Sequence, residues 1–322
     1  MSVPALRRSG WWATSAGLAG GMLLDRVVGD PRRGHPVAAF GRAALLGERV
    51  LYADAKLPGV LHAGVLVGGA AGLGLAAGRV APGAVSRGVL TALATWSVVG
   101  GTTLRAEADA MSRLIGAAEL DRARRRLSHL CGRDASALDA DGLARATVES
   151  VAENTSDAVV GPLVWGAAFG MPGLLGYRAV NTLDAMVGHR SPRYARFGWA
   201  SARADDLANL LPARLSAALA TAFAPAVGGT PAAAVRAWRR DAGKHPSPNA
   251  GRVEAAFAGA LGRTLGGPLT YDGRPDPRTT LGDGPQPAPA DIARAARLSA
   301  VVSTAAAALA VAVRLGIDGR RR

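Results

Sequence analysis

The sequence has only one cysteine, Cys131, among its 322 residues. A single cysteine excludes an intramolecular disulfide and a cluster of cysteine ligands around a metal. Aromatic residues are also scarce, at 5%, although 49% of the residues are hydrophobic. Alanine and glycine fill long uncharged runs instead. This is not the composition of two soluble domains, which the length alone would allow.

The sequence also lacks a Walker A loop and a recognisable nucleic-acid-binding motif. If a nucleotide binds, it binds without a P-loop. The formal charge of +14 at pH 7 comes from arginines spread over the segments between apolar runs. Membrane-protein loops that stay in the cytoplasm carry this bias. We therefore expect no nucleic acid among the partners, and we expect the polar loops to be cytoplasmic.

Several apolar runs approach or reach the ~20 residues that a helix needs to cross a bilayer. They span residues 11–24, 58–78, 84–104, 159–180, 207–227 and 298–313. The spacing of Gly17 with Gly21, and of Gly64 with Gly68 and Gly72, lets membrane helices approach one another closely. We therefore expect an all-α fold: a polytopic helical membrane protein with a single integral membrane domain over residues 1–322.

One of these runs, 159–180, is interrupted by Pro162 and by Pro172-Gly173. A broken helix at membrane depth is tolerated only where its freed backbone groups line a cavity or meet a ligand. The loops on both sides of the run are basic, and a re-entrant segment keeps them on one side. We expect re-entrant or broken helices here. The expected polar functional loops are residues 25–57, 105–158, 181–206 and 228–297.

Three carboxylates, Glu149, Glu153 and Asp157, recur every four residues just before the broken run. On a helix they would share one face, about one turn apart. Like charges at this spacing repel, so the row favours a cation or an amine against it. A solvated helix face is the alternative. Ionisable groups at the mouth of an apolar segment favour a functional role.

Other polar residues gather in the loops. Asp30, Arg32 and His35 lie among prolines and glycines, although a juxtamembrane turn has a similar composition. The loop after the broken run contains Asn181, Asp184, Arg193, Arg203, Asp205 and Asp206. Arginine forks suit phosphates and carboxylates, whereas Asp and Asn oxygens suit magnesium. The string Lys-His-Pro-Ser-Pro-Asn-Ala-Gly at 244–251 is a turn that opens a helix, and helix N-termini attract anions.

Five segments together resemble the adenosylcobinamide-phosphate synthase family, the membrane proteins of cobalamin biosynthesis. They are DRVVGDPRRGHPV, ESVAENTSDAVVGP, YRAVNTLDAMVGHRSPRYARFGWASARADDLANLLPARL, DAGKHPSPNAGRVEAAFAGALG and TLGDG. The resemblance covers nearly the whole chain in the expected order. It implies a multi-pass protein of the cell membrane.

The resemblance also implies an ATP-dependent ligase. Such an enzyme joins adenosylcobyric acid, a corrinoid, to 1-aminopropan-2-ol phosphate or to ethanolamine phosphate, giving adenosylcobinamide phosphate. Activation of a carboxylate through an acyl phosphate requires ATP, magnesium and a site that excludes water. The expected partners are these substrates, the lipid bilayer and other enzymes of the cobalamin pathway.

Residue chemistry on the matching motifs suggests a role for each polar residue. The expected catalytic residues are Glu149, Glu153, Asp184 and Asp205. The expected metal ligands are Glu149, Glu153, Asp157 and Asp206. The residues expected to bind substrate or phosphate are Asp30, Arg32, His35, Asn154, Asn181, Arg193, Arg203, Lys244, His245 and Asn249. Two other functions remain open: a transporter of a corrin or an ion, and a membrane scaffold for corrin-pathway enzymes.

Overall fold

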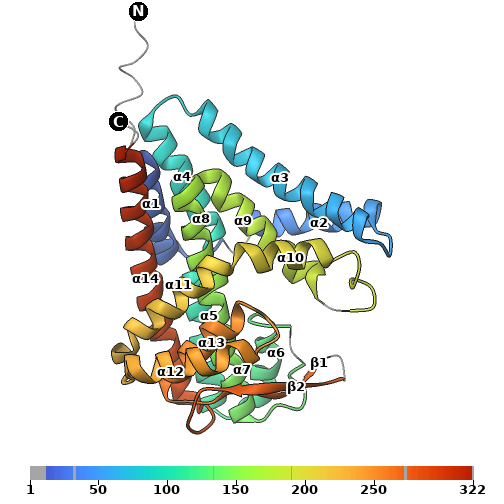
Figure 1. The fold of residues 1–322 in the computed structure, drawn as a ribbon, viewed down its shortest axis with the longest axis vertical. Helices are drawn as coiled ribbons and strands as arrows, with labels where there is room; N and C mark the ends of the chain where they lie inside the picture. The colour runs from blue at the N-terminus through green and yellow to red at the C-terminus, as the bar shows by residue number, and fades with distance from the viewer. Residues whose placement is uncertain (1–11, 32–33, 133, 190, 272–273, 321–322) are drawn as a thin grey trace, which may run out of the picture. The chain divides into compact units, whose positions relative to one another are not determined.

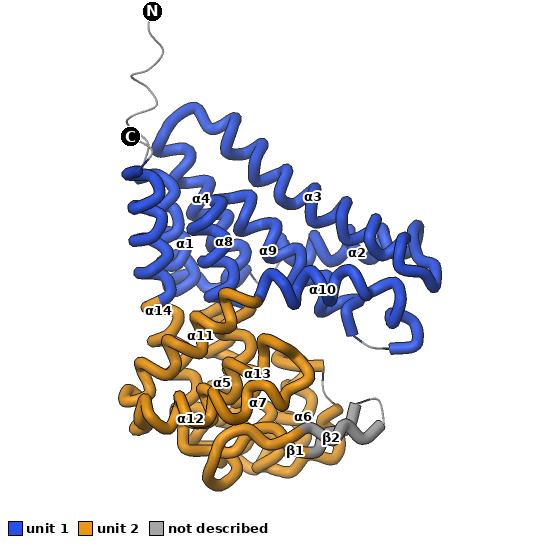
Figure 2. The backbone as a smooth tube through the Cα atoms, viewed as in Figure 1, with its two compact units in different colours: residues 1–100, 158–209, 306–322 blue, residues 101–157, 210–305 orange. Residues whose placement is uncertain are grey.

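The computed structural model describes residues 12–31, 34–132, 134–189, 191–271 and 274–320, and it is mainly helical (Figure 1). The chain divides into two compact units (Figure 2). Unit 1 comprises residues 1–100, 158–209 and 306–322, and unit 2 comprises residues 101–157 and 210–305. The helical class expected from the sequence is confirmed. The single integral membrane domain stays a prediction.

Unit 1 is built from helices that pack in pairs. Its elements are α1 (Ala13–Val28), α2 (Pro36–Leu51), α3 (Lys56–Val80), α4 (Ala84–Val98), α8 (Gly161–Phe169), α9 (Met171–Leu183), the π-helical turn η3 (Asp184–Gly188), α10 (Trp199–Ala208) and the C-terminal part of α14 (Pro289–Arg320). The most extensive pairings are α1 with α4 and α3 with α9, and α8 also packs on α9. Sequential neighbours such as α3 and α4 touch much less.

The expected close approach at Gly17 and Gly21 is confirmed, and the partner helix is α4. A Cβ at Gly17 would lie 2.4 Å from Thr91 Cβ, and one at Gly21 would lie 2.3 Å from Thr95 Cβ. Both distances are far below van der Waals contact. Only glycine therefore permits α1 and α4 to approach this closely.

The prediction that the small-residue spacing in α3 marks its packing face was wrong. A side chain at Gly59 or Gly74 would collide with the backbone of another segment. The glycines singled out in the sequence are Gly64, Gly68 and Gly72. A Cβ at any of these three positions would have no neighbouring atom within 4 Å. The glycines that determine how α3 packs are therefore different members of the same run.

Helix breaks were predicted correctly in one run and missed in another. Run 159–180 is interrupted at Gly170, whose φ of 68° ends α8 before α9 begins. Run 84–104 was expected to be continuous, but α4 ends at Val98 and the next helix begins at Gly101. In this gap the Gly100 N–H donates to the Ala158 carbonyl at 3.1 Å. A hydrogen bond to a residue distant in sequence thus satisfies the backbone at this break. The apolar composition of the run did not reveal the break.

Unit 2 combines helices with one β-hairpin. Its elements are α5 (Gly101–Gly116), α6 (Leu120–Leu127), α7 (Ala140–Thr155), α11 (Leu210–Ala222), the 3-10 turn η4 (Ala224–Val227), α12 (Pro231–Asp241), the 3-10 turn η5 (Ala242–Lys244), α13 (Ala250–Leu261), β1 (Leu265–Tyr271), β2 (Arg274–Leu281) and the N-terminal part of α14. The π-helical turn η2 (Ser156–Val160) continues α7. Helix α13 packs against both α11 and α12 and buries Val253, Phe257 and Leu261.

The hairpin lies within residues 228–297, which were expected to be a polar functional loop. Strands β1 and β2 pair antiparallel, from Leu265 opposite Leu281 to Tyr271 opposite Arg274, with an irregularity between Gly266 and Pro268. Leu265 and Leu281 are both fully buried. The hairpin is therefore attached to the core of unit 2 at its open end.

Among the described helices, α3 and α14 are long and apolar enough to cross a membrane by length and composition. Helix α3 exposes large apolar side chains along its length, including Leu57, Val65 and Leu73. Helix α11 is apolar but has only 13 residues. Two apolar helices are consistent with membrane association, whereas the multi-pass arrangement stays a prediction.

Candidate functional site

The structure places the predicted site residues in both units. Unit 1 contains Asp30, His35, Asn181, Asp184, Arg193, Arg203, Asp205 and Asp206. Unit 2 contains Glu149, Glu153, Asn154, Asp157, Lys244, His245 and Asn249. Arg32 lies outside the described residues.

In unit 1, two asparagine side chains orient the carboxylate of Asp205, which lies in the last turn of α10. The Asn209 Nδ2 group donates to Asp205 Oδ2 at 2.9 Å, and Asn181 Nδ2 donates to Asp205 Oδ1 at 3.4 Å. Asn209 follows Asp205 by four residues, which places both on one face. Asn181 comes from the end of α9. The structure thus brings together Asp205 and Asn181, two of the predicted site residues, and adds Asn209.

Tyr177 fixes the orientation of the Asn209 amide. Its hydroxyl donates to Asn209 Oδ1 at 2.7 Å, and both side chains are buried. With its oxygen occupied, the amide turns its NH₂ group toward Asp205. A Cβ at Gly161 would lie 2.1 Å from the Tyr177 hydroxyl, so glycine makes room for it. The sequence analysis missed the role of Tyr177, although Tyr177 and Asn181 have the i, i+4 spacing that would have suggested it.

The surroundings of Asp205 raise the pKa of its carboxyl above the ordinary value. Burial raises the pKa of the Asp205 carboxyl, and the nearby charge of Asp206 raises it further. The hydrogen bonds from Asn209 and Asn181 oppose this shift without cancelling it. A carboxylate with neutral amide partners and a raised pKa is suited to accept a proton.

Other charged residues of unit 1 make contacts of their own. Arg178 Nη1 lies 3.5 Å from Asn181 Oδ1. Arg203 pairs with Asp206 at 3.2 Å in an exposed i, i+3 pair, a type that contributes about 0–1 kcal/mol. Asp184 opens the π-helical turn η3, and a Cβ at Gly188 would collide with its carboxylate. Their catalytic, phosphate and metal roles stay predictions.

Arg193 is bound by a residue that the sequence analysis did not single out, Glu48 of α2. Glu48 is 6% exposed, and its Oε1 accepts from Arg193 Nη2 and from the Tyr194 hydroxyl, each at 2.9 Å. The guanidinium also stacks over Tyr52 at 4.0 Å from the ring centroid. Burial raises the pKa of the Tyr194 hydroxyl. Arg193 therefore attaches its loop to α2, and its expected phosphate contact stays a prediction.

Asp30 and His35 lie close together at the start of α2. The His35 Nε2 and Asp30 Oδ1 atoms are 3.9 Å apart. On the other side of its ring, His35 Nδ1 accepts the Val37 N–H at 3.1 Å and caps α2. The structure thus brings these two predicted site residues together, and their contact with substrate stays a prediction.

In unit 2, the three spaced carboxylates have three different environments. Glu149 is buried, accepts the Gly266 N–H at 2.7 Å and lies 4.0 Å from Arg145 Nε, one turn earlier. It therefore joins α7 to the hairpin. Glu153 is exposed, and Asp157 is partly buried in the wider turn η2. The side chain of Asn154 donates back to the Ser150 carbonyl at 2.9 Å.

Magnesium fits only part of the expected ligand set. Across the residues that the structure describes, no three His, Cys, Asp or Glu side chains gather closely enough to hold a metal ion by themselves. Magnesium bound through substrate phosphates needs only one or two protein carboxylates. By exposure alone, the exposed Glu153 and the partly buried Asp157 suit that requirement better than the buried Glu149.

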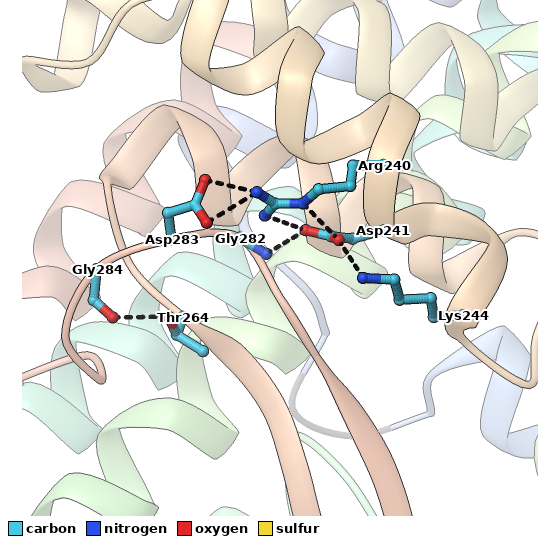
Figure 3. Close-up of polar contacts among 7 residues, drawn as sticks. All are labelled: Arg240, Asp241, Lys244, Thr264, Gly282, Asp283 and Gly284. Atoms are coloured by element: carbon cyan, nitrogen blue, oxygen red, sulfur yellow. Dashed lines mark hydrogen bonds and ion pairs between the residues drawn. The ribbon is translucent and has the colours of Figure 1, made fainter.

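A second ordered carboxylate, Asp241, lies at the end of α12 (Figure 3). It is 1% exposed, and it accepts from the Arg240 guanidinium at 2.7 and 2.8 Å and from the Lys244 ammonium at 2.8 Å. The Gly282 N–H donates to it at 2.9 Å. The hydrogen bonds from Arg240 dominate in lowering the pKa of Asp241 far below its ordinary value. The segments DAGK and TLGDG thus meet at one side chain.

The turn after Lys244 is held by its own side chains. His245 Nδ1 accepts the Ser247 N–H at 3.0 Å, and His245 Nε2 lies 3.7 Å from Glu254 Oε1 of α13. Both members of that pair are 6% exposed. Asn249 is also buried. His245 and Asn249 therefore have the burial of residues that shape the turn, and their contact with substrate stays a prediction.

Comparison with known proteins gives matches to one family over most of the chain. The family described as CobD/Cbib protein matches residues 18–299. A cobalamin biosynthesis protein CobD of Mycobacterium tuberculosis is 54% identical over 303 residues, which cover 94% of this chain and 96% of that protein. A protein of the same name from Chromobacterium violaceum is 42% identical over 306 residues, with 92% and 96% coverage. One from Geobacter metallireducens is 43% identical over 270 residues, with 81% and 84% coverage. No solved structure matches the chain.

Proposed function

Because the chain belongs to the CobD/Cbib family of cobalamin biosynthesis proteins, we propose that it is an ATP-dependent amide ligase. It joins the free carboxylate of adenosylcobyric acid to the amine of 1-aminopropan-2-ol phosphate or of ethanolamine phosphate. The product is adenosylcobinamide phosphate. Family membership supports the pathway, and the five family-like segments in their expected order support the reaction.

The reaction requires activation because a carboxylate does not react with an amine directly. Transfer of the terminal phosphoryl group of ATP to a carboxylate oxygen gives an acyl phosphate and ADP. The neutral amine then attacks the acyl carbon. A C–N bond forms, the C–O bond to phosphate breaks, and the phosphate leaves with that electron pair. The amine loses one proton, which a base in the site accepts.

The observation that carries the proposal is the Asp205 carboxylate, which has neutral hydrogen-bond partners and a raised pKa. Such a group takes up the proton of the attacking amine more readily than an ordinary aspartate does. Asn209 and Asn181 hold both of its oxygens in fixed positions. Tyr177 supports this geometry through its hydrogen bond to Asn209.

The remaining roles follow from the positions of the side chains. Glu153, which is exposed, and Asp157, which is partly buried, would hold magnesium bound with ATP, with Glu149, Asp184 and Asp206 as further candidates, and the ion would neutralise phosphate charge. The residues proposed to bind phosphate or substrate are Asp30, His35, Asn154, Arg193, Arg203, Lys244, His245 and Asn249. The exposed apolar surface of α3 supports membrane association. We propose a multi-pass protein of the cell membrane with its polar loops in the cytoplasm because the sequence has several apolar runs with arginines between them.

The direct test is product formation by purified protein in detergent. The protein receives adenosylcobyric acid, 1-aminopropan-2-ol phosphate, ATP and magnesium, and mass spectrometry detects the amide. Product that disappears when any one addition is omitted supports the ligase. Folded protein that forms no product counts against it. A parallel series with ethanolamine phosphate identifies the preferred amine.

A transporter is the second candidate, because the helix break at Gly170 resembles the discontinuous helices of transporters. A transporter would move a corrin across sealed vesicles without forming an amide. A membrane scaffold would tolerate substitution of Asp205 with no loss of pathway flux. The ligase requires the opposite result in both experiments.

A further inference from the structure

We propose that Arg240 and Lys244 form a binding site for a phosphate ester in unit 2, and that Asp283 is the carboxylate that the ester displaces (Figure 3). That this phosphate belongs to a substrate rests on the proposed function. The site itself rests on the side-chain geometry around Asp241.

Asp241 is the fixed centre of this cluster. Its Oδ1 accepts from Arg240 Nε and Lys244 Nζ, and its Oδ2 accepts from Arg240 Nη2 and the Gly282 N–H. Each oxygen therefore has two donors, which uses the hydrogen-bonding capacity of a carboxylate. Since Asp241 is also buried, it holds the two cationic groups in place and is itself closed to a ligand.

The two cations keep hydrogen-bond donors that Asp241 does not use. The side chains of Arg240 and Lys244 are 48% and 46% exposed. An ammonium has three N–H donors, and Asp241 accepts one of them. Arg240 turns its Nη1 toward Asp283 instead. Arg240 Nε and Lys244 Nζ both contact Asp241 Oδ1 at 2.8 Å, so the two positive charges lie close together, and both attract an anion that takes the place of Asp283 at Arg240 Nη1.

Charge favours an anion at this position. Two cations around one buried carboxylate leave an excess of one positive charge. Asp283 offsets it, with Oδ1 and Oδ2 at 2.9 and 3.1 Å from Arg240 Nη1, but Asp283 is 70% exposed. An exposed ion pair is weak and is screened by salt. A phosphate monoester has more charge and more acceptor oxygens than a carboxylate, so it can displace Asp283 from Arg240. Another carboxylate would bind little better than Asp283 itself.

The backbone around the cluster is held firmly. The Thr279 hydroxyl donates to the Lys244 carbonyl at 3.1 Å, and the Thr264 hydroxyl donates to the Gly284 carbonyl at 2.7 Å. Gly282 and Gly284, on either side of Asp283, have φ values of 84° and 109°, which favour glycine. Asp283 can therefore change its side-chain position while its neighbours keep the cations in place.

The test measures binding of [³²P]phosphate and of ethanolamine phosphate to the full chain in detergent by equilibrium dialysis. The variants are Arg240→Gln, Asp283→Asn and the control Arg239→Gln, an exposed arginine next to Arg240 on the same helix. We expect Arg240→Gln to weaken binding about tenfold or more, as loss of a charge-assisted contact does. Asp283→Asn should strengthen binding about threefold to tenfold by removing the competing carboxylate. Arg239→Gln should stay within about twofold.

Two results would overturn the site. One is an equal loss in the Arg240 and Arg239 variants, which indicates only general attraction of anions. The other is unchanged or weaker binding in Asp283→Asn, which indicates a purely structural cluster. Misfolding cannot imitate the expected gain in the Asp283 variant.

Kinetics of the Arg240→Gln variant separate the source of the phosphate and the fate of each proposal. A KM increase for the aminoalcohol phosphate alone assigns the site to that substrate, and an increase for ATP alone assigns it to the nucleotide. Unchanged KM values for both, in an active enzyme, overturn this inference and leave the ligase intact. If wild-type protein forms no amide but binds phosphate, and the Arg240→Gln variant loses that binding, the result supports the site and counts against the ligase.

Discussion

Asp205 in unit 1 and Asp241 in unit 2 both lie in the last turn of a helix, but their hydrogen-bond partners differ. Asp205 accepts from the neutral amides of Asn181 and Asn209, whereas Asp241 accepts from a guanidinium, an ammonium and a backbone N–H. Burial alone raises the pKa of any carboxyl. The result is a raised pKa at Asp205 and a lowered pKa at Asp241, where the contacts with cations outweigh burial.

This difference separates a carboxylate suited to reaction from one suited to structure. A base must hold a proton for part of the catalytic cycle, which a raised pKa permits. Asp241 stays ionised throughout and fixes the positions of two cations. Removal of each group should therefore affect different measurements, activity at Asp205 and stability at Asp241.

The largest expected effect is on catalysis. Substitution Asp205→Asn keeps the hydrogen-bonding shape but removes the base, and it should lower kcat by about 10²–10⁴-fold. Steady-state amide formation measures the rate, and circular dichroism checks the fold. The matched control is Asp54→Asn, an exposed aspartate of unit 1 that is 64% accessible. If the Asp205 variant kept a rate within a few-fold of wild type, Asp205 could not be the base.

The next effect is on stability. Substitution Asp241→Asn removes the charge that binds Arg240 and Lys244 and should lower the free energy of unfolding by about 2 kcal/mol at neutral pH. Because the folded pKa of Asp241 is lowered, this contribution is complete above the unfolded pKa of about 3.9 and is lost as the pH falls toward the folded value. Denaturant titrations of both proteins from pH 7 to pH 3 measure the difference.

The matched control for Asp241 is Asp121→Asn, whose aspartate pairs with Arg124 at 2.7 Å but is 81% exposed. It should change stability by less than about 1 kcal/mol. A stability difference between wild type and Asp241→Asn that grows at acidic pH would contradict the lowered pKa of Asp241.

A smaller effect is expected one step away from Asp205. Substitution Tyr177→Phe removes the hydroxyl that orients Asn209 and leaves a buried amide oxygen without its donor. We expect a loss of about 1–2 kcal/mol in stability and about a tenfold fall in kcat at an unchanged KM. Kinetics with both substrates varied will test this. A change in KM alone would show that Tyr177 acts on substrate binding rather than on the geometry of the base.

The smallest expected effect is the change in the free energy of unfolding when an exposed ion pair is removed. Arg196 and Asp54 are 3.9 Å apart, and both side chains are mostly exposed, at 65% and 64%. Substitution Arg196→Gln should change the free energy of unfolding by less than about 0.5 kcal/mol, and by even less at high salt. A loss above about 1 kcal/mol in thermal or chemical denaturation would mean that exposed pairs here are stronger than the comparison assumes.

Local patterns predicted part of the fold. The spacing of Gly17 and Gly21 predicted a close helix contact, and the prolines and glycines of run 159–180 predicted its break. The end of α4 at Val98 was missed because glycine pairs such as Gly20-Gly21 also occur inside helices of this chain, so Gly100-Gly101 did not stand out as a break. The β-hairpin was missed because its strands contain prolines and glycines typical of loops. In both cases the missing information is a contact distant in sequence.

The site shows the same limit. The density of polar residues indicated Asp205 and Asn181, which do meet in unit 1. The partner of Arg193 is Glu48, 145 residues away, and no local pattern joins them. Glu149 looked like part of an unpaired row because its hydrogen bond to Gly266 crosses 117 residues of sequence. Sequence chemistry therefore identified reactive residue types, whereas partners, and with them the pKa directions, required the fold.

The most direct test of the ligase is to follow one oxygen atom. Adenosylcobyric acid labelled with ¹⁸O in its free carboxylate is incubated with the protein, ATP, magnesium and 1-aminopropan-2-ol phosphate. Mass spectrometry then measures the label in the released phosphate. Activation through an acyl phosphate predicts one ¹⁸O in phosphate for each amide formed, because the carboxylate oxygen leaves with the phosphoryl group. Amide formation with unlabelled phosphate would contradict this account.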